Sequence, residues 1–104
     1  MKHLILVLAT IFSINTFATV VEVVPLENGV LFEDDNWGAI DYYAKRLEDN
    51  TYIWLGNDRK AKLYKPGKYE IGGQSVNNIC YSSSKVINVK EEKYKAIELN
   101  ISCE

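Results

Sequence analysis

The stretch from residue 51 to residue 75 constrains the fold more than any other part of this 104-residue chain. It is dense in aromatic and β-branched residues and is interrupted by two turn-forming dipeptides, Asn57-Asp58 and Pro66-Gly67. Short runs of this composition between such dipeptides are typical of β-strands joined by tight turns. The predicted strands cover residues 51–55, 60–64 and 69–71.

Two details of this stretch lead to further predictions. Residues 51–55 are apolar on both faces, so we expect this strand at the centre of a sheet. Gly72-Gly73 is expected to end the third strand, because glycine weakens a strand interior.

The N-terminus has the pattern of a secretory signal peptide. A basic start, Met1-Lys2-His3, precedes an apolar run over residues 4–12 and small residues at Thr16 and Ala18. The run is too short to span a bilayer, which takes about 20 apolar residues. We predict cleavage after Ala18, which leaves residues 19–104 as one small domain.

The chain has two cysteines, Cys80 and Cys103. In an exported protein we expect them to form a disulfide, since a redox-active pair would need a C-x-x-C spacing. Closing a loop of this length stabilises a fold by about 3 kcal/mol in the chain-entropy description. The sequence therefore predicts an exported protein, periplasmic or extracellular, with one structural disulfide.

The segment 37–47 is compatible with two structures. Asn36 is suited to cap a helix in which Trp37, Ile40, Ala44 and Leu47 follow one another at spacings of three and four. The same segment also suits a strand that turns at residues 48–50 and returns at Tyr52. The spacing favours a short helix near 37–47 and leaves the strand as the alternative.

Both ends of the predicted domain have strand patterns. Residues 19–24 are rich in valine, and Pro25 is expected to end that strand. Residues 85–89 and 94–103 are predicted to form a hairpin around the polar turn 90–93. One face of the last strand carries Ile97, Leu99, Ile101 and Cys103.

The register of this hairpin conflicts with the disulfide. Pairing Ile87 with Ile97 and pairing Cys80 with Cys103 need registers one residue apart, and such a slip inverts the faces of a strand. A β-bulge at residues 82–84 would reconcile the two pairings, and a loop position for Cys80 is the alternative. In total, the sequence predicts a mainly β fold, a small antiparallel β-sandwich with Greek-key or hairpin connections.

The residue inventory excludes most enzyme chemistry. The only histidine, His3, lies in the predicted signal peptide, so the domain has no imidazole for a general base, a catalytic triad or a zinc site. A disulfide also removes both thiols. We therefore expect a protein that is not an enzyme and has no catalytic residues, no cofactor and no metal. A hydrolase that uses carboxylates, as glycosidases do, is an alternative.

Acidic and aromatic residues near the start of the domain form the predicted contact surface. The acidic cluster at 33–35 lacks the spacing of an EF-hand loop and is expected to be solvated. Exposed aromatic residues mark interfaces, whereas Tyr52, Trp54 and Tyr69 in the strand-rich stretch are expected in the core. The predicted partner-binding residues are Trp37, Tyr42, Tyr43, Glu33, Asp34 and Asp35.

The basic residues from Arg59 to Lys68 have Tyr64 and Tyr69 among them, a pattern that can bind nucleic acid or anionic glycans. The chain nevertheless has a formal net charge of −2 and an export signal, and lysine commonly protects strand edges. We expect an envelope or exported protein as the partner, in an inhibitor or immunity-type role among others. No nucleic acid and no membrane span are expected, and the oligomeric state is left open.

About half of the domain resembles a PEGA-type module, a small β-sandwich of cell-envelope proteins. The similarity lies in residues 52–56, in the strand and proline-glycine turn of 62–71, and in 86–89 and 95–101. The glycine-proline positions that this family has between its first two strands are replaced by residues 58–61. The resemblance implies a sandwich that acts by binding.

A second resemblance is to the Greek keys of βγ-crystallins. Phe32 and Trp37 are five residues apart and precede Gly38, and the asparagines at 77–78 precede serines at 82–83. Gly38 comes one residue early, and one extra residue separates the asparagines from the serines. This resemblance implies a calcium-binding structural domain with Asn77, Asn78 and Ser82 as ligands.

Overall fold

The computed structural model describes residues 18–34, 38–91 and 93–104. Nearly all of the predicted signal peptide therefore lies outside the described residues. Within these ranges every regular element is a strand. The strands are β1 (Thr19–Glu27), β2 (Val30–Leu31), β3 (Ile40–Arg46), β4 (Thr51–Trp54), β5 (Lys60–Leu63), β6 (Gly67–Ser75), β7 (Cys80–Ser82), β8 (Lys85–Val89) and β9 (Lys93–Cys103).

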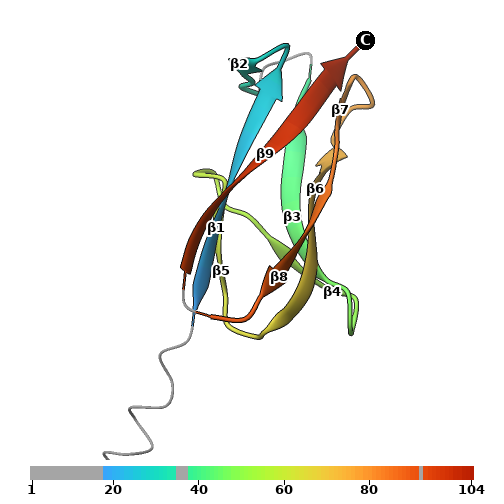
Figure 1. Ribbon diagram of the computed structural model, residues 1–104. Coiled ribbons are helices and arrows are strands. Elements are labelled where there is room, and N and C mark those ends of the chain that lie inside the picture. Colours follow the sequence, from blue (N-terminus) through green and yellow to red (C-terminus); the bar gives the residue numbers. More distant parts are fainter. Residues whose placement is uncertain (1–17, 35–37, 92) are drawn as a thin grey trace, which may run out of the picture.

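The strands form two sheets that enclose one core, which confirms the predicted β-sandwich (Figure 1). One sheet has the order β2-β1-β9-β7, and its fifth strand, β5, also pairs with β1. The other sheet has the order β4-β3-β6-β8 and is antiparallel throughout. Because β4, β5 and β6 alternate between the sheets, the two turns between them connect layers and do not form hairpins.

The first and last strands run side by side in the same direction. β1 pairs in parallel with β9 from Thr19 opposite Lys93 to Leu26 opposite Asn100, so this sheet is mixed (Figure 1). Both strands alternate buried and outward-facing side chains, as a sheet with one face on the core requires. The predicted inner face of β9 is confirmed, with Ile97, Leu99 and Ile101 buried.

The prediction that Pro25 ends the first strand is wrong. Val23 N donates to Arg59 O at 2.9 Å, and Pro25 O accepts from Phe32 N at 2.9 Å. These backbone groups therefore face the edge of β1 that β5 and β2 share, away from β9. Proline has no N–H to donate, and at position 25 this group would point to the edge of β1 that β5 and β2 share. The pairing of β1 with β9 does not need it and continues past Pro25.

The predicted helix over 37–47 is also wrong, and the strand alternative is confirmed. Ile40, Tyr42 and Ala44 are buried at every second position of β3, which fits a strand and not a helix. The turn at residues 47–50 then leads into β4, with Asn50 at a φ of 58°. Asparagine tolerates this left-handed conformation better than most residues.

The predicted hairpin of 85–89 with 94–103 does not form. β8 pairs with β6 in one sheet, whereas β9 lies between β1 and β7 in the other. The disulfide partners Cys80 and Cys103 face each other directly across β7 and β9, so the predicted disulfide is confirmed. The conflict of registers disappears, because Ile87 and Ile97 belong to different sheets and need no bulge between them.

Gly72-Gly73 does not end β6, contrary to prediction. Tyr43 pairs with Gly72 and Tyr42 pairs with Gly73 across β3 and β6. A Cβ atom at Gly72 would lie 2.8 Å from the Tyr43 hydroxyl oxygen, and one at Gly73 would lie 3.1 Å from Tyr42 Cδ1. The two glycines thus continue the strand and make room for two tyrosine rings.

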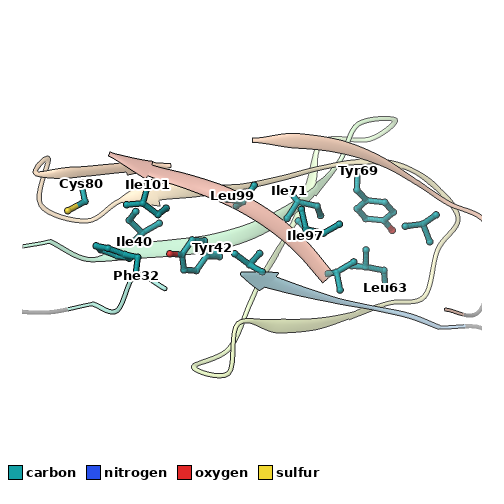
Figure 2. Close-up of a cluster of buried hydrophobic side chains, with 14 residues drawn as sticks. Phe32, Ile40, Tyr42, Leu63, Tyr69, Ile71, Cys80, Ile97, Leu99 and Ile101 are labelled. Carbon is teal, nitrogen blue, oxygen red and sulfur yellow. The ribbon is translucent and has the colours of Figure 1, made fainter. Parts of the chain in front are cut away.

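The core extends along the space between the two sheets (Figure 2). At one end, Phe32, Ile40 and Ile101 lie near Cys80, and at the other end Leu63 packs near the ring of Tyr69 (Figure 2). No helix of the described residues is long and apolar enough to cross a membrane.

Candidate functional site

Three aromatic side chains gather on the outer face of the four-stranded sheet. Tyr43 on β3 is the register partner of Trp54 on β4, and Tyr52 lies two residues earlier on β4. The rings of Tyr52 and Trp54 stack at 5.8 Å with an interplanar angle of 14°, and the Tyr43 ring is 5.3 Å from Tyr52 and 5.8 Å from Trp54. We call these three residues the aromatic cluster.

The aromatic cluster is open to solvent. Tyr52 is 46% exposed and Trp54 is 51% exposed, whereas Tyr43 is partly buried beneath them. Its rings already contact one another at distances typical of favourable aromatic pairs, so the cluster keeps its shape without a ligand. A large, ordered and exposed aromatic surface is typical of sites that bind a partner.

Charged groups of both signs border the cluster. The Tyr43 hydroxyl donates a hydrogen bond to Glu70 Oε1 at 2.8 Å, and Lys45 Nζ lies 5.5 Å from the centre of the Tyr52 ring. Burial and, after it, the hydrogen bond to Glu70 raise the pKa of Tyr43 to about 12, so its hydroxyl is a neutral donor at physiological pH. These contacts fix the orientation of Tyr43 and Tyr52.

The strand β4 is at the end of its sheet, and not at the centre as predicted. Tyr52 and Trp54 point to the outer face of this sheet and are exposed, although the sequence favoured a place in the core. Tyr69, the third predicted core aromatic, is confirmed there with 1% exposure. An end strand also leaves one row of backbone groups unpaired, to which an extended peptide can add.

The predicted partner-binding residues are not all brought together. Tyr43 lies in the aromatic cluster, whereas Tyr42 is only 7% exposed, so its placement on the contact surface is wrong. Glu33 and Asp34 are exposed, as predicted for a solvated acidic segment. Asp35 and Trp37 lie outside the described residues. Tyr42 and Tyr43 are separated because adjacent side chains of a strand point to opposite faces of the sheet.

The aromatic cluster was not predicted, although the sequence contains a signal for it. Once residues 40–46 are taken as a strand that turns at 47–50, the pairing places position 43 opposite 54 and position 45 opposite 52. Cross-strand neighbours of this kind share one face. The helix that the sequence favoured would have separated them.

A polar cavity of about 320 Å³ opens at the end of the core that Phe32 and Ile40 close. Its wall is made by residues 32–34, which follow β2, by β3 and by the connection from β4 to β5. The residues around it are Phe32, Glu33, Asp34, Ile40, Asp41, Tyr42, Leu55, Gly56, Asn57 and Arg59. Two of the predicted acidic residues, Glu33 and Asp34, thus meet Tyr42 here and not at the aromatic cluster.

No metal site is formed by three or more histidine, cysteine, aspartate or glutamate side chains in the part of the chain that the structure describes. Asn78, one of the calcium ligands implied by the crystallin resemblance, has a structural role in a turn. Its N–H donates to Ser75 Oγ at 3.0 Å, and its carbonyl accepts from the Tyr81 hydroxyl at 2.9 Å.

No known protein family matches the sequence, and no characterised protein is significantly similar to it. The resemblances to PEGA-type modules and to βγ-crystallins therefore stay predictions.

Proposed function

We propose that this protein is an exported, non-enzymatic binding protein that presents the aromatic cluster to a protein partner. The observation that supports this function is the half-exposed, stacked pair of Tyr52 and Trp54 on a sheet face, held by Tyr43. Aromatic residues of this kind supply most of the affinity at protein interfaces, because they bury a large area with few rotatable bonds.

The surroundings of the aromatic cluster favour a protein as the partner. Lys45 and Glu70 place one positive and one negative group beside the rings, which resembles the polar rim of an interface. The outer edge of β4 adds backbone donors and acceptors, which a peptide strand of a partner can match. An aromatic surface bordered by both signs of charge and by a strand edge suits a polypeptide better than a nucleic acid.

The disulfide supports an oxidising compartment for this interaction. Together with the predicted signal peptide, it favours the periplasm or the extracellular space, and an envelope or exported protein as the partner. An inhibitor or immunity-type role would use the same surface, since such proteins act by covering a site on their target.

A capture experiment tests this function. The oxidised protein comprising residues 19–104 is immobilised and incubated with native envelope extract, both with calcium and with a chelator. We expect one stoichiometric protein partner under both conditions, and its loss from the double variant Tyr52→Ala/Trp54→Ala. Tyr64→Ala is the matched control, because Tyr64 is 64% exposed but lies outside the aromatic cluster.

Two results would contradict the proposal. A partner that the double variant retains as well as the control would show that the aromatic cluster is not the binding surface. Retention that requires calcium would favour the crystallin-like alternative, a calcium-binding structural domain.

A further inference from the structure

Tyr42, one of the residues that border the polar cavity, has a buried hydroxyl group that no other described residue satisfies. The side chain of Tyr42 is more than nine-tenths buried, and its oxygen has no hydrogen-bond partner among the described residues. Figure 2 shows this oxygen on the side of the ring that faces Phe32, at the end of the core where the cavity lies. Buried polar atoms in native proteins are nearly always paired, so an orphan of this kind points to a hydrogen-bond partner that the described residues do not supply.

A comparison with the other buried tyrosine shows that the orphan is not a general feature of this core. Tyr69 is 1% exposed and lies toward the opposite end of the sandwich (Figure 2). Its hydroxyl donates a hydrogen bond to Lys65 O at 2.8 Å. The fold therefore satisfies one buried tyrosine with its own backbone and leaves the hydroxyl of Tyr42, a residue that borders the cavity, without such a partner.

The charges around the cavity are mainly negative. Glu33, Asp34 and Asp41 border it, and none of the three carboxylates forms an ion pair within the described ranges. Asp34 Oδ1 accepts one long hydrogen bond, 3.4 Å, from Ile40 N. Arg59 is the only cation that borders the cavity among the described residues, and its Nε donates to Val23 O at 3.3 Å.

We propose that this cavity binds an organic cation, an alkylammonium or guanidinium group, with Asp34 as the counter-charge and the Tyr42 hydroxyl as a neutral acceptor. Three carboxylates against one guanidinium disfavour an anion. The three carboxylates are not arranged as a metal site. An organic cation suits them better than a metal ion, because its N–H groups donate hydrogen bonds to carboxylate and hydroxyl oxygens.

The other walls of the cavity suit the alkyl stem that carries such a cation. Phe32 and Leu55 supply apolar surface beside the carboxylates, and long basic side chains bury their methylene groups in this manner. Burial and, after it, the negative charge of Asp34 raise the pKa of Tyr42 to about 12, so the phenol stays protonated and can accept a hydrogen bond at physiological pH.

This chemistry has two sources, a basic side chain of a protein and a free small amine. The amides of Nα-acetyl-arginine and Nα-acetyl-lysine represent the protein side chain, and putrescine represents the free amine. Each is titrated into the ¹⁵N-labelled protein, and backbone amide shifts are followed. We expect saturable shifts around Asp34, Tyr42 and residues 55–57, with a Kd in the millimolar range, and the stronger ligand identifies the source.

The matched neutral ligand is the amide of Nα-acetyl-citrulline, which keeps the shape of arginine without its charge. It should cause no saturable shift. Asp34→Asn should weaken arginine amide binding by about tenfold, and Tyr42→Phe by about fivefold. Glu98→Gln is the control variant, because it removes one carboxylate from the exposed outer face of β9 and should leave the affinity unchanged.

Three outcomes would overturn the proposal: shifts from citrulline amide equal to those from arginine amide, no saturable shift with any cation, or equal weakening by Asp34→Asn and Glu98→Gln. The amide spectrum of each variant reports whether it is folded, so a loss of binding is not mistaken for unfolding. The aromatic cluster takes no part in this test, and the cavity and the proposed protein-binding function can succeed or fail independently.

Discussion

Tyr42 and Tyr43 are consecutive in the chain but lie on opposite faces of β3, each across from a glycine of β6. Tyr42 pairs with Gly73 and points into the sandwich, whereas Tyr43 pairs with Gly72 and lies on the outer face. One dipeptide thereby contributes to both candidate sites, the cavity inside and the aromatic cluster outside. Both rings have the space they need because the residue across the strand pair has no side chain.

Removing the Tyr42 hydroxyl should stabilise the folded protein. The oxygen is buried without a partner among the described residues, and an unsatisfied buried group costs about 1–3 kcal/mol. We expect Tyr42→Phe to raise the free energy of unfolding by about 1 kcal/mol, measured by urea denaturation in the absence of any amine.

Tyr69→Phe is the matched comparison, because Tyr69 is also a buried tyrosine but its hydroxyl donates to Lys65 O. That variant leaves a carbonyl without its donor and should lower the free energy of unfolding by about 1 kcal/mol. If both variants destabilise the protein to the same extent, the Tyr42 hydroxyl has a partner in solution and does not await a ligand.

The stability of the protein should fall at alkaline pH, and Tyr42 should contribute to the fall. Its pKa is raised to about 12, against an ordinary value of about 10 in the unfolded chain. Between these two values the unfolded chain has lost the proton that the folded state still holds. The unfolded state then binds fewer protons, so the free energy of unfolding decreases as the pH rises.

Tyr42→Phe removes this contribution, and its free energy of unfolding should decrease less steeply over the same range. Tyr43, whose pKa is also raised to about 12, is present in both proteins and cancels in the comparison. Denaturation curves at several alkaline pH values measure both slopes. Parallel slopes for the two proteins would show that Tyr42 titrates at its ordinary pKa.

Local sequence pattern was sufficient for several of the strands, β9 among them, and for the disulfide. The inner face of β9 follows from alternation alone, since Ile97, Leu99 and Ile101 are apolar and the residues between them are not. Pairing of Cys80 with Cys103 follows from the number of cysteines and the predicted export. Both inferences rest on properties that a strand or a pair of thiols has in any fold.

The pairing of the strands could not be predicted from local sequence pattern. β8 and β9 are joined by a short polar connection, which suits a hairpin as well as a crossing from one sheet to the other. The choice depends on β1, which occupies the edge of β9 in parallel orientation. That contact joins residues at opposite ends of the chain and has no local signal.

The faces of β4 were equally ambiguous. A strand with apolar residues on both faces is either central and covered on both sides, or an end strand that exposes aromatic residues. The sequence favoured the first, and the structure has the second, with Tyr52 and Trp54 on the open face. Such a departure from the usual burial pattern is expected at sites that bind a partner.

The disulfide should contribute a large share of the stability of this small domain. Cys80 and Cys103 are 23 residues apart, and a loop of this size is worth about 3 kcal/mol in the chain-entropy description. The double variant Cys80→Ala/Cys103→Ala should therefore melt at a lower temperature than the oxidised protein. A reducing agent should lower the melting temperature of the native protein and leave that of the double variant unchanged, and equal melting of all samples would contradict a structural role.

Gly73→Ala should destabilise the fold, because the inner face of β6 has no space for a methyl group at this position. The added Cβ would lie 2.4 Å from Ile40 Cγ2, 3.0 Å from Ser82 Cβ and 3.1 Å from Tyr42 Cδ1. Forcing an extra carbon into a packed core typically costs about 1–3 kcal/mol, and we expect a loss of this size in urea denaturation.

Gly56→Ala is the control for this prediction, since its added Cβ has only Asp58 Oδ1 as a near neighbour, at 3.3 Å in an exposed turn. It should change the free energy of unfolding by less than about 0.5 kcal/mol. Because Ile40 and Tyr42, which both border the cavity, would have to move in Gly73→Ala, that variant should also lose affinity for arginine amide. Full stability and full affinity in Gly73→Ala would mean that Tyr42 does not pack against β6 in solution, and the position assigned to its hydroxyl would have to be abandoned.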